Sequence, residues 1–344
     1  MFDDPNIRKK NYGYLDYESM LESANKNNFH VSIATIPLDY SKGIAAKSFF
    51  NDYAHLFSLL IHGNNHVHQE LYRSCGSEFA RKTLRQSLSR IEYLEARSSI
   101  SISRVMVPPH GRINNLFLRE LSKLEFDAVC LPRGALRHLA TPEKLGRVIG
   151  MMPSEVIEDV TLVPRFPIER PFRNNVIISA LLKQPIIAAG HHDDFKSGIE
   201  LIEEIAEYVN SFNDVHWENL TNISRSLFNL AIVGTTCVVD VFSNKITLSL
   251  PRGTDGILLV TPHWLNNKND TYFCRDLFDS NSWHKYSFDE IIAVKPLSVL
   301  EIFSCNHYEF SETPGRLVDA RSIVPFVRRV ITEGRDRLAA TLGL

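Results

Sequence analysis

Strand-like and helix-like stretches alternate over about the first 230 residues, and this alternation limits the possible folds more than any other feature. The strand-like stretches are rich in valine and isoleucine and cover residues 29–37, 57–63, 102–109, 127–132 and 185–190, with further candidates at 160–163 and 175–180. The helix-like stretches carry apolar residues on one face and cover residues 15–25, 79–97, 115–123 and 198–212. Such alternation is typical of βα units, so we expect a parallel sheet with helices outside it.

The pattern changes after about residue 230. Short β-rich runs follow, separated by the turn-like sequences SNK and RGTDG, and a helix-like stretch over 322–340 comes last. We expect two domains: a (β/α) barrel over residues 1–228, and a small antiparallel β-rich domain over 229–344 that ends in a helix. The proline-rich region 133–173 interrupts the first pattern, as an insertion or an irregular rim would.

The composition excludes several classes of protein. The 344 residues include 38 basic and 40 acidic side chains, and this net charge of −2 gives no sign of a nucleic-acid partner. No apolar run approaches the ~20 residues that span a bilayer, and the first residues lack the apolar core of a signal peptide, so we expect a cytoplasmic protein. The five cysteines form no CxxC pair, which argues against a disulfide framework and a cysteine zinc site. Nothing in the composition indicates an oligomeric state.

Pairs of polar residues stand at three predicted strand ends: Asp3 and Asp4, His62 and His66, and His191 and His192. The carboxyl ends of barrel strands converge on one face, so these pairs can meet in space. Each pair alone also has a simpler interpretation. The aspartates can be solvated or cap a turn, and the histidines can be ordinary hydrogen-bonded residues.

His62 and His66 can face the same way if one helical turn begins at the strand end. Their imidazoles can then share one divalent ion, with a carboxylate as the third ligand. Zinc is the first candidate for this ion, with Co, Mn and Ni as alternatives. Such an ion lowers the pKa of water to about 7 and polarises a carbonyl group. A second carboxylate can accept the water proton, and a separate histidine can protonate a leaving group.

The order of these motifs resembles the polysaccharide deacetylase superfamily, whose best-known branch is the family 4 carbohydrate esterases. FDDPN resembles the aspartate pair of that family, HGNNH its histidine pair, VPPHG at 107–111 its proline-containing strand end, and AAGHH its final histidine motif. The resemblance covers residues 1 to about 225 and implies an incomplete (β/α)₇ barrel with a metal-dependent site.

The resemblance also implies roles for individual residues. Asp3 would be the general base, and His191 or His192 the general acid. Asp4, His62 and His66 would bind the metal, and Pro109 and His110 would flank the substrate groove. For the family's fourth motif, which orients the base, the candidates are Arg165 and Asp159. Separately, Trp217 can stack on a sugar near the barrel mouth, although packing at a helix start is an alternative.

The first strand poses a physical problem, because only Met1 and Phe2 precede the aspartates and a strand needs about five residues. Either the sequence starts late, or the sheet is open at this point.

Three functions follow from these features. The first is a metal-dependent hydrolase that removes an acetyl or other acyl group from an N- or O-acylated sugar or polysaccharide. The second is a catalytically inactive relative that binds carbohydrate. The third is a metal-dependent hydrolase of a non-glycan C–N bond, acting on another acylated small molecule.

Overall fold

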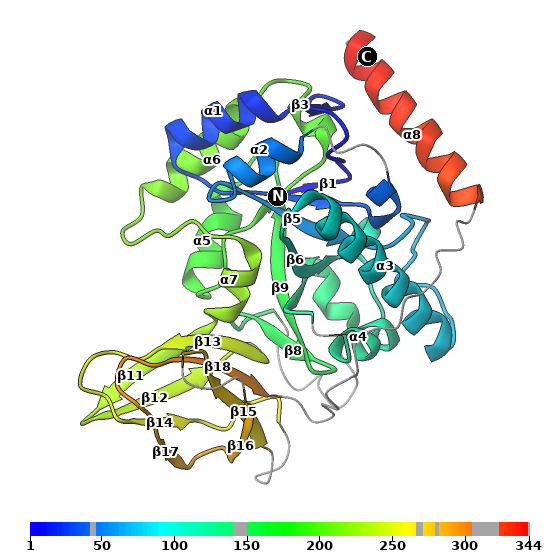
Figure 1. Cartoon of the computed structure of the whole chain (residues 1–344). Coiled ribbons are helices and arrows are strands. Elements are labelled where there is room, and N and C mark those ends of the chain that lie inside the picture. Colours follow the sequence, from blue (N-terminus) through cyan, green and yellow to red (C-terminus); the bar gives the residue numbers. More distant parts are fainter. Residues whose placement is uncertain are drawn as a thin grey trace.

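The computed structural model describes residues 1–41, 46–124, 126–139, 150–265, 271–278, 282–304 and 323–342. These residues form a parallel barrel, two smaller sheets below it in the view, and a separate C-terminal helix (Figure 1). Cys305 lies outside the described residues. No helix in the described ranges is both long and apolar enough to cross a membrane.

The barrel confirms the α/β fold class that the alternation predicts. Among the described residues, neighbouring barrel strands all pair in parallel. In spatial order they are β1 (Phe2–Asp3), β4 (Val31–Thr35), β5 (Phe57–His62), β6 (Ile102–Val107), β7 (Ala128–Pro132), β9 (Val160–Pro167) and β10 (Ala188–Ala189). A bridge between Phe2 and Gly190 brings the first strand next to the last. We call the carboxyl end of these strands the mouth of the barrel.

The two-residue strand β1 is hydrogen-bonded on both sides, so the barrel is not open at this point. Asp3 donates its backbone N–H to Gly190, and Asp4 donates its own to Ala34. Below β1, a cavity of about 480 Å³ lies between the amino-terminal ends of β4 and β10. The short first strand therefore fixes both aspartates at the mouth, and the space lies at the other end of the barrel.

Alternation along the strands separates two cores. Leu59 and Ile61 belong to the outer core beneath the helices, whereas Leu60 and its neighbours Val105 and Val107 belong to a second, inner cluster. Side chains on a strand point alternately to opposite faces, so His62 lies on the same inward face as Leu60. The strand pattern thus directs a polar side chain into the barrel at its mouth.

Helices cover the outside of the barrel (Figure 1). They are α1 (Tyr17–Asn27), α2 (Lys47–Asp52), α3 (Ser77–Ser98), α4 (Asn115–Ser122), α5 (Arg173–Leu181), α6 (Glu200–Asn210) and α7 (Leu220–Arg225). The shorter elements are η1 (Pro37–Ser41), η2 (Pro109–Gly111), η3 (Arg133–Leu139) and η5 (His192–Phe195), with strands β2 (Asn11–Tyr12), β3 (Leu15–Asp16) and β8 (Glu155–Ile157).

One predicted strand is wrong, because residues 175–180 lie inside helix α5. The run NVIISA has the β-branched composition of a strand, yet only Val176 and Ser179 of α5 are buried, and they are three residues apart as on one helix face. Ile177 and Ile178 remain exposed. Contact with the barrel along one face outweighs the weak strand preference of these residues.

Eight strands follow α7: β11 (Phe228–Val233), β12 (Thr236–Val241), β13 (Lys245–Ser249), β14 (Gly256–Leu259), β15 (Thr271–Asp276), β16 (His284–Ser287), β17 (Ile291–Ala293) and β18 (Val299–Ser304). In the described part of the chain they form two four-stranded sheets around one apolar core. Their pairing is antiparallel as expected, except that β12 and β14 run parallel. The last described element is helix α8 (Ile323–Leu342).

A buried carboxylate connects the barrel to the two four-stranded sheets. Glu301 on β18 accepts hydrogen bonds from Arg225 and Arg275, and Lys245 lies 3.6 Å away. Arg225 also donates to Asp127, directly before β7, at 2.8 Å. Burial would raise the pKa of Glu301, but these cations outweigh burial and lower the pKa below its ordinary value.

We expect Glu301→Gln to destabilise the protein at pH 7 by about 2 kcal/mol, because the cations lose their shared partner. A carboxyl whose pKa is lowered by folding contributes stability above its unfolded pKa of ~4.3, and this contribution is lost as the pH falls through the folded value. The difference from the parent protein should therefore shrink below about pH 4. Urea unfolding at pH 7 and below about pH 4 measures this difference in stability, with the exposed Glu290→Gln as control. An equal difference at both pH values would contradict the assignment.

Candidate metal centre

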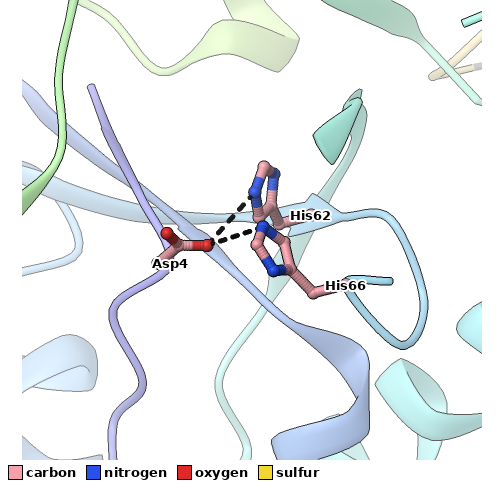
Figure 2. A group of neighbouring side chains, drawn as sticks. All are labelled: Asp4, His62 and His66. Atoms are coloured by element: carbon pink, nitrogen blue, oxygen red, sulfur yellow. Dashed lines mark ion pairs between the residues drawn. The ribbon is translucent and has the colours of Figure 1, made fainter. Parts of the chain in front are cut away.

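Asp4, His62 and His66 meet at the mouth of the barrel (Figure 2). Asp4 follows β1, His62 ends β5, and His66 lies in the next loop. The Nε2 atoms of His62 and His66 lie 3.4 Å and 3.0 Å from Oδ1 of Asp4. One ligand atom from each residue lies within 4.8 Å of the other two. The sequence predicts this group, and the structure brings its members together.

The state of these side chains fits a divalent cation. His62 donates its Nδ1–H to the carbonyl of Val107 at 2.8 Å, which leaves the Nε2 lone pair directed at Asp4. That Nε2 atom and Oδ1 of Asp4 are both buried, and neither has a hydrogen-bond partner among the described residues. Burial lowers the pKa of His66 to about 4, so this imidazole is neutral near pH 7. Two imidazoles and one carboxylate are a donor set for zinc or a related ion.

The surroundings of Asp4 favour its ionised form. Burial alone would raise the pKa of this carboxyl. The neighbouring imidazole of His191, together with those of His62 and His66, outweighs burial and holds the pKa well below its ordinary value. Asp4 is thus a carboxylate at neutral pH, as a metal ligand must be.

His66 reaches the site through a clamped loop, not through the helical turn that the sequence allowed. Gly63 begins the loop with φ +62°, where Pro109 leaves no room for a Cβ atom. The carboxylate of Glu70 accepts the backbone N–H groups of Asn64, Asn65 and His66 at 2.9 to 3.2 Å. Because one carboxylate binds three successive amides, the chain curls around it and His66 turns back toward His62.

Helix α3 supports the same loop from outside. Buried Arg90 donates to the side chains of Asn64 and Asn65 at 2.7 and 2.9 Å, and Ser87 donates to the carbonyl of Gly63. Sequence reasoning did not identify these supports, because nothing in their spacing relates them to the histidines.

Asp3 is paired with Arg165 inside the barrel. The guanidinium donates two hydrogen bonds to the carboxylate, at 2.8 and 2.7 Å, and both side chains are buried. Burial would raise the pKa of Asp3, but Arg165 outweighs it and lowers the pKa. Asp159, the other candidate for orienting the base, lies between β8 and β9, where its carbonyl accepts a hydrogen bond from Asn244.

His191 and His192 point to different surroundings. His191 places Nδ1 3.4 Å from Oδ2 of Asp4. Its hydrogen bond to Asp4 raises the pKa of His191 to about 9, and its ring remains half exposed at the mouth. His192 is buried between Tyr12 and Tyr14, with Nε2 3.4 Å from Asp336 of α8. Of the two, only His191 contacts the metal-ligand group.

The three residues predicted to bind substrate also separate. Pro109 and His110 lie beside the metal-ligand group, where the ring of His110 is 5.3 Å from that of His66. Trp217 is at the other end of the barrel, where it packs against Phe29 at the start of β4 and lines the 480 Å³ cavity. The structure therefore does not bring Trp217 together with the other predicted site residues.

Helix α8 supplies a part of the site that sequence reasoning did not find. Buried Arg329 donates to the backbone carbonyl of Asp4 at 2.8 Å, to Asp39 at 2.9 Å and to the Tyr12 hydroxyl at 3.0 Å. This links the loop after β1 to the last helix, and Asp4 adopts φ +80° there. Left-handed backbone is rare outside glycine and persists where neighbours enforce it.

Comparisons with known proteins find similarity in structure only. No protein-family model matches the chain, and no curated protein matches it either. A protein assigned as a polysaccharide deacetylase from Mycobacterium smegmatis is 14% identical, with a TM-score of 0.42 over 62% of this chain and 77% of that one. A family 4 carbohydrate esterase from Streptomyces lividans in complex with acetate is 12% identical, with a TM-score of 0.34 over 60% and 82%. A CE4 family pseudoenzyme from Bacillus anthracis is 10% identical, with a TM-score of 0.33 over 61% and 57%. These likenesses concern the fold alone.

Proposed function

We propose that this chain is a metal-dependent hydrolase that removes an acyl group from an N- or O-acylated sugar. One observation carries the proposal. The Asp4–His62–His66 group, the Asp3–Arg165 pair and His191 lie together at the barrel mouth. These are a ligand set, a carboxylate base and an imidazole acid, which together can hydrolyse an amide or ester.

Asp4, His62 and His66 would hold the ion. When bound, a divalent ion would supply Lewis-acid polarisation of an acyl carbonyl and a lowered pKa for water. Three protein ligands leave coordination positions open for water and substrate, as in catalytic sites. The hydrogen bond of His62 to Val107 and the Glu70 clamp on the His66 loop would fix the ligands before the ion arrives.

Asp3 would accept a proton from the attacking water. Its two hydrogen bonds to Arg165 keep it ionised and fix its orientation. His191 would donate a proton to the departing amine or alcohol, because its half-exposed ring lies beside Asp4 on the solvent side of the site. Pro109 and His110 would border the substrate. The proposed site does not include Trp217, which lies at the opposite end of the barrel.

The test begins with metal-free protein, to which Zn, Co, Mn or Ni is returned separately. Acetate release is measured from acetylated amino sugars, acetylated xylan and simple N-acyl amides. We expect release from a sugar substrate, dependent on the ion and abolished by a chelator. Metal binding without release from any of these substrates would contradict hydrolysis, and sugar binding by that protein would favour the non-catalytic carbohydrate-binding function. Release from simple amides alone would indicate a non-glycan hydrolase, and failure to bind metal would overturn the proposal.

A further inference from the structure

A cavity of about 250 Å³ opens beside the metal-ligand group, and α8 forms one of its walls. Asp4, His66 and His191 line it on the barrel side. The residues that α8 contributes are Pro325, Arg328, Arg329, Thr332, Arg335 and Asp336. The wall that α8 forms in this cavity therefore carries three arginines.

The position of α8 is fixed by polar contacts with the barrel side of the site. Arg329 bonds to Asp39 and Tyr12, and the Tyr12 hydroxyl donates in turn to Asp336 at 3.1 Å. About two turns after Arg329, Arg337 donates to the carbonyl of Asn11 at 3.0 Å. The inward face of the helix is thus charged. Its outward face exposes Val324, Val327, Ile331 and Leu338.

The three arginines of this cavity differ in the partners that they have among the described residues. Arg329 is paired with Asp39, and Arg335 donates to Asp336 at 2.7 Å. Arg328 makes no hydrogen bond or ion pair to any residue that the structure describes. Its charge adds to burial and to the neighbouring histidines in lowering the pKa of His110.

A guanidinium group on the wall of a cavity is suited to binding an anion. Its planar fork matches the two oxygens of a carboxylate or phosphate, and such charge-assisted bonds are stronger than those between neutral groups. A neutral acylated sugar offers this cation hydroxyl and carbonyl oxygens but no opposite charge. A sugar that carries an acidic substituent beside the reacting acyl group has one.

We propose that Arg328 binds an anionic substituent, carboxylate or phosphate, on the acylated sugar that occupies this cavity. The sugar part of this inference rests on the proposed function, whereas the anion part rests on α8. Arg335 lies on the same wall, where it can add a second interaction by turning from Asp336. The helix is then a determinant of specificity for acidic over neutral substrates.

The test measures binding, so that it does not depend on turnover. Three probes share an N-acetylated sugar ring: N-acetylglucosamine, its 6-phosphate and N-acetylmuramic acid. Calorimetry with the zinc-loaded protein and with the metal-free protein gives their affinities, because a phosphate could also bind to the ion itself. We expect at least one acidic probe to bind about tenfold or more tightly than the neutral one.

Arg328→Gln should reduce this preference to less than about threefold in both forms of the protein. The matched control is Arg252→Gln, an exposed arginine in the second domain. The preferred probe identifies the anion as phosphate or carboxylate.

Two results would overturn the inference: equal affinity for all probes, or an acidic preference that survives Arg328→Gln. Binding of no acidic probe at roughly 5 mM would also overturn it. Failure of the proposed function is distinguishable. An Arg328-dependent preference without acyl release would leave the inference intact and remove the hydrolase. Release from neutral and acidic probes at equal rates would support the hydrolase and overturn the inference.

Discussion

His66→Ala is expected to abolish metal binding and to lower acyl release by about a thousandfold, because a metal supplies several kcal/mol of transition-state stabilisation and each 1.36 kcal/mol is tenfold in rate. The residue lies in a loop after β5, and its side chain is 22% exposed. Removing this mostly buried ring also costs some packing, so stability is measured beside metal content. Metal content by elemental analysis, urea unfolding and acyl release are measured on the same preparation.

His68→Ala is the matched control. His68 is an exposed histidine of the same loop and lies outside the metal-ligand group. It should retain both metal and turnover. His62→Ala/His66→Ala should behave as His66→Ala does, with an added loss of stability because the carbonyl of Val107 loses its partner. Unchanged turnover in His66→Ala would rule out the metal mechanism.

Asp3→Asn is expected to retain the metal and to lower turnover by about 10²- to 10⁴-fold, the usual contribution of a general base. The buried pair with Arg165 adds a second effect. Removal of one charge leaves the guanidinium uncompensated inside the barrel, so the free energy of unfolding should fall by about 3 kcal/mol. Arg165→Met should destabilise by a similar amount, because it leaves Asp3 buried without its cation.

Elemental analysis and urea unfolding separate these two effects of Asp3→Asn. Asp214→Asn, an exposed aspartate at the far end of the barrel, controls for the substitution itself. Should Asp3→Asn lose its metal while remaining folded, Asp3 would be a ligand as well as a base. Full turnover by folded Asp3→Asn would exclude it as the base.

The sequence predicts the metal-ligand group because each member follows a strand of the same parallel barrel. His62 and His66 are close in sequence, and Asp4 reaches them through the convergence of strand ends. The pairing of Asp3 with Arg165 is harder to predict from the sequence, since 162 positions separate them. Only the inward direction of both side chains brings them together. His191 and His192 are adjacent in sequence, and the sequence could not tell them apart without the tyrosines that enclose His192.

Helix α8 shows why the remaining part of the site could not be predicted from the sequence. Its apolar residues at helical spacing predict a helix but not its contacts, and the structure packs the charged face with Arg329 and Asp336 inward. Pattern reading assumes that burial follows hydrophobicity, which fails where a helix contacts a polar mouth. The position of Trp217 could not be predicted either, because the sequence does not indicate at which end of the barrel this residue lies.

The bond from Arg329 to Asp4 joins residues 325 positions apart. A ribosome releases the chain from its amino end at about 5–20 residues per second. Barrel strands can begin to pair during this time, but the backbone at Asp4 forms its hydrogen bond to Arg329 only after α8 has been made. Maturation of the site therefore waits for the synthesis of α8, and a nascent chain that stops before α8 carries its proposed metal ligands without the contact that secures the first of them.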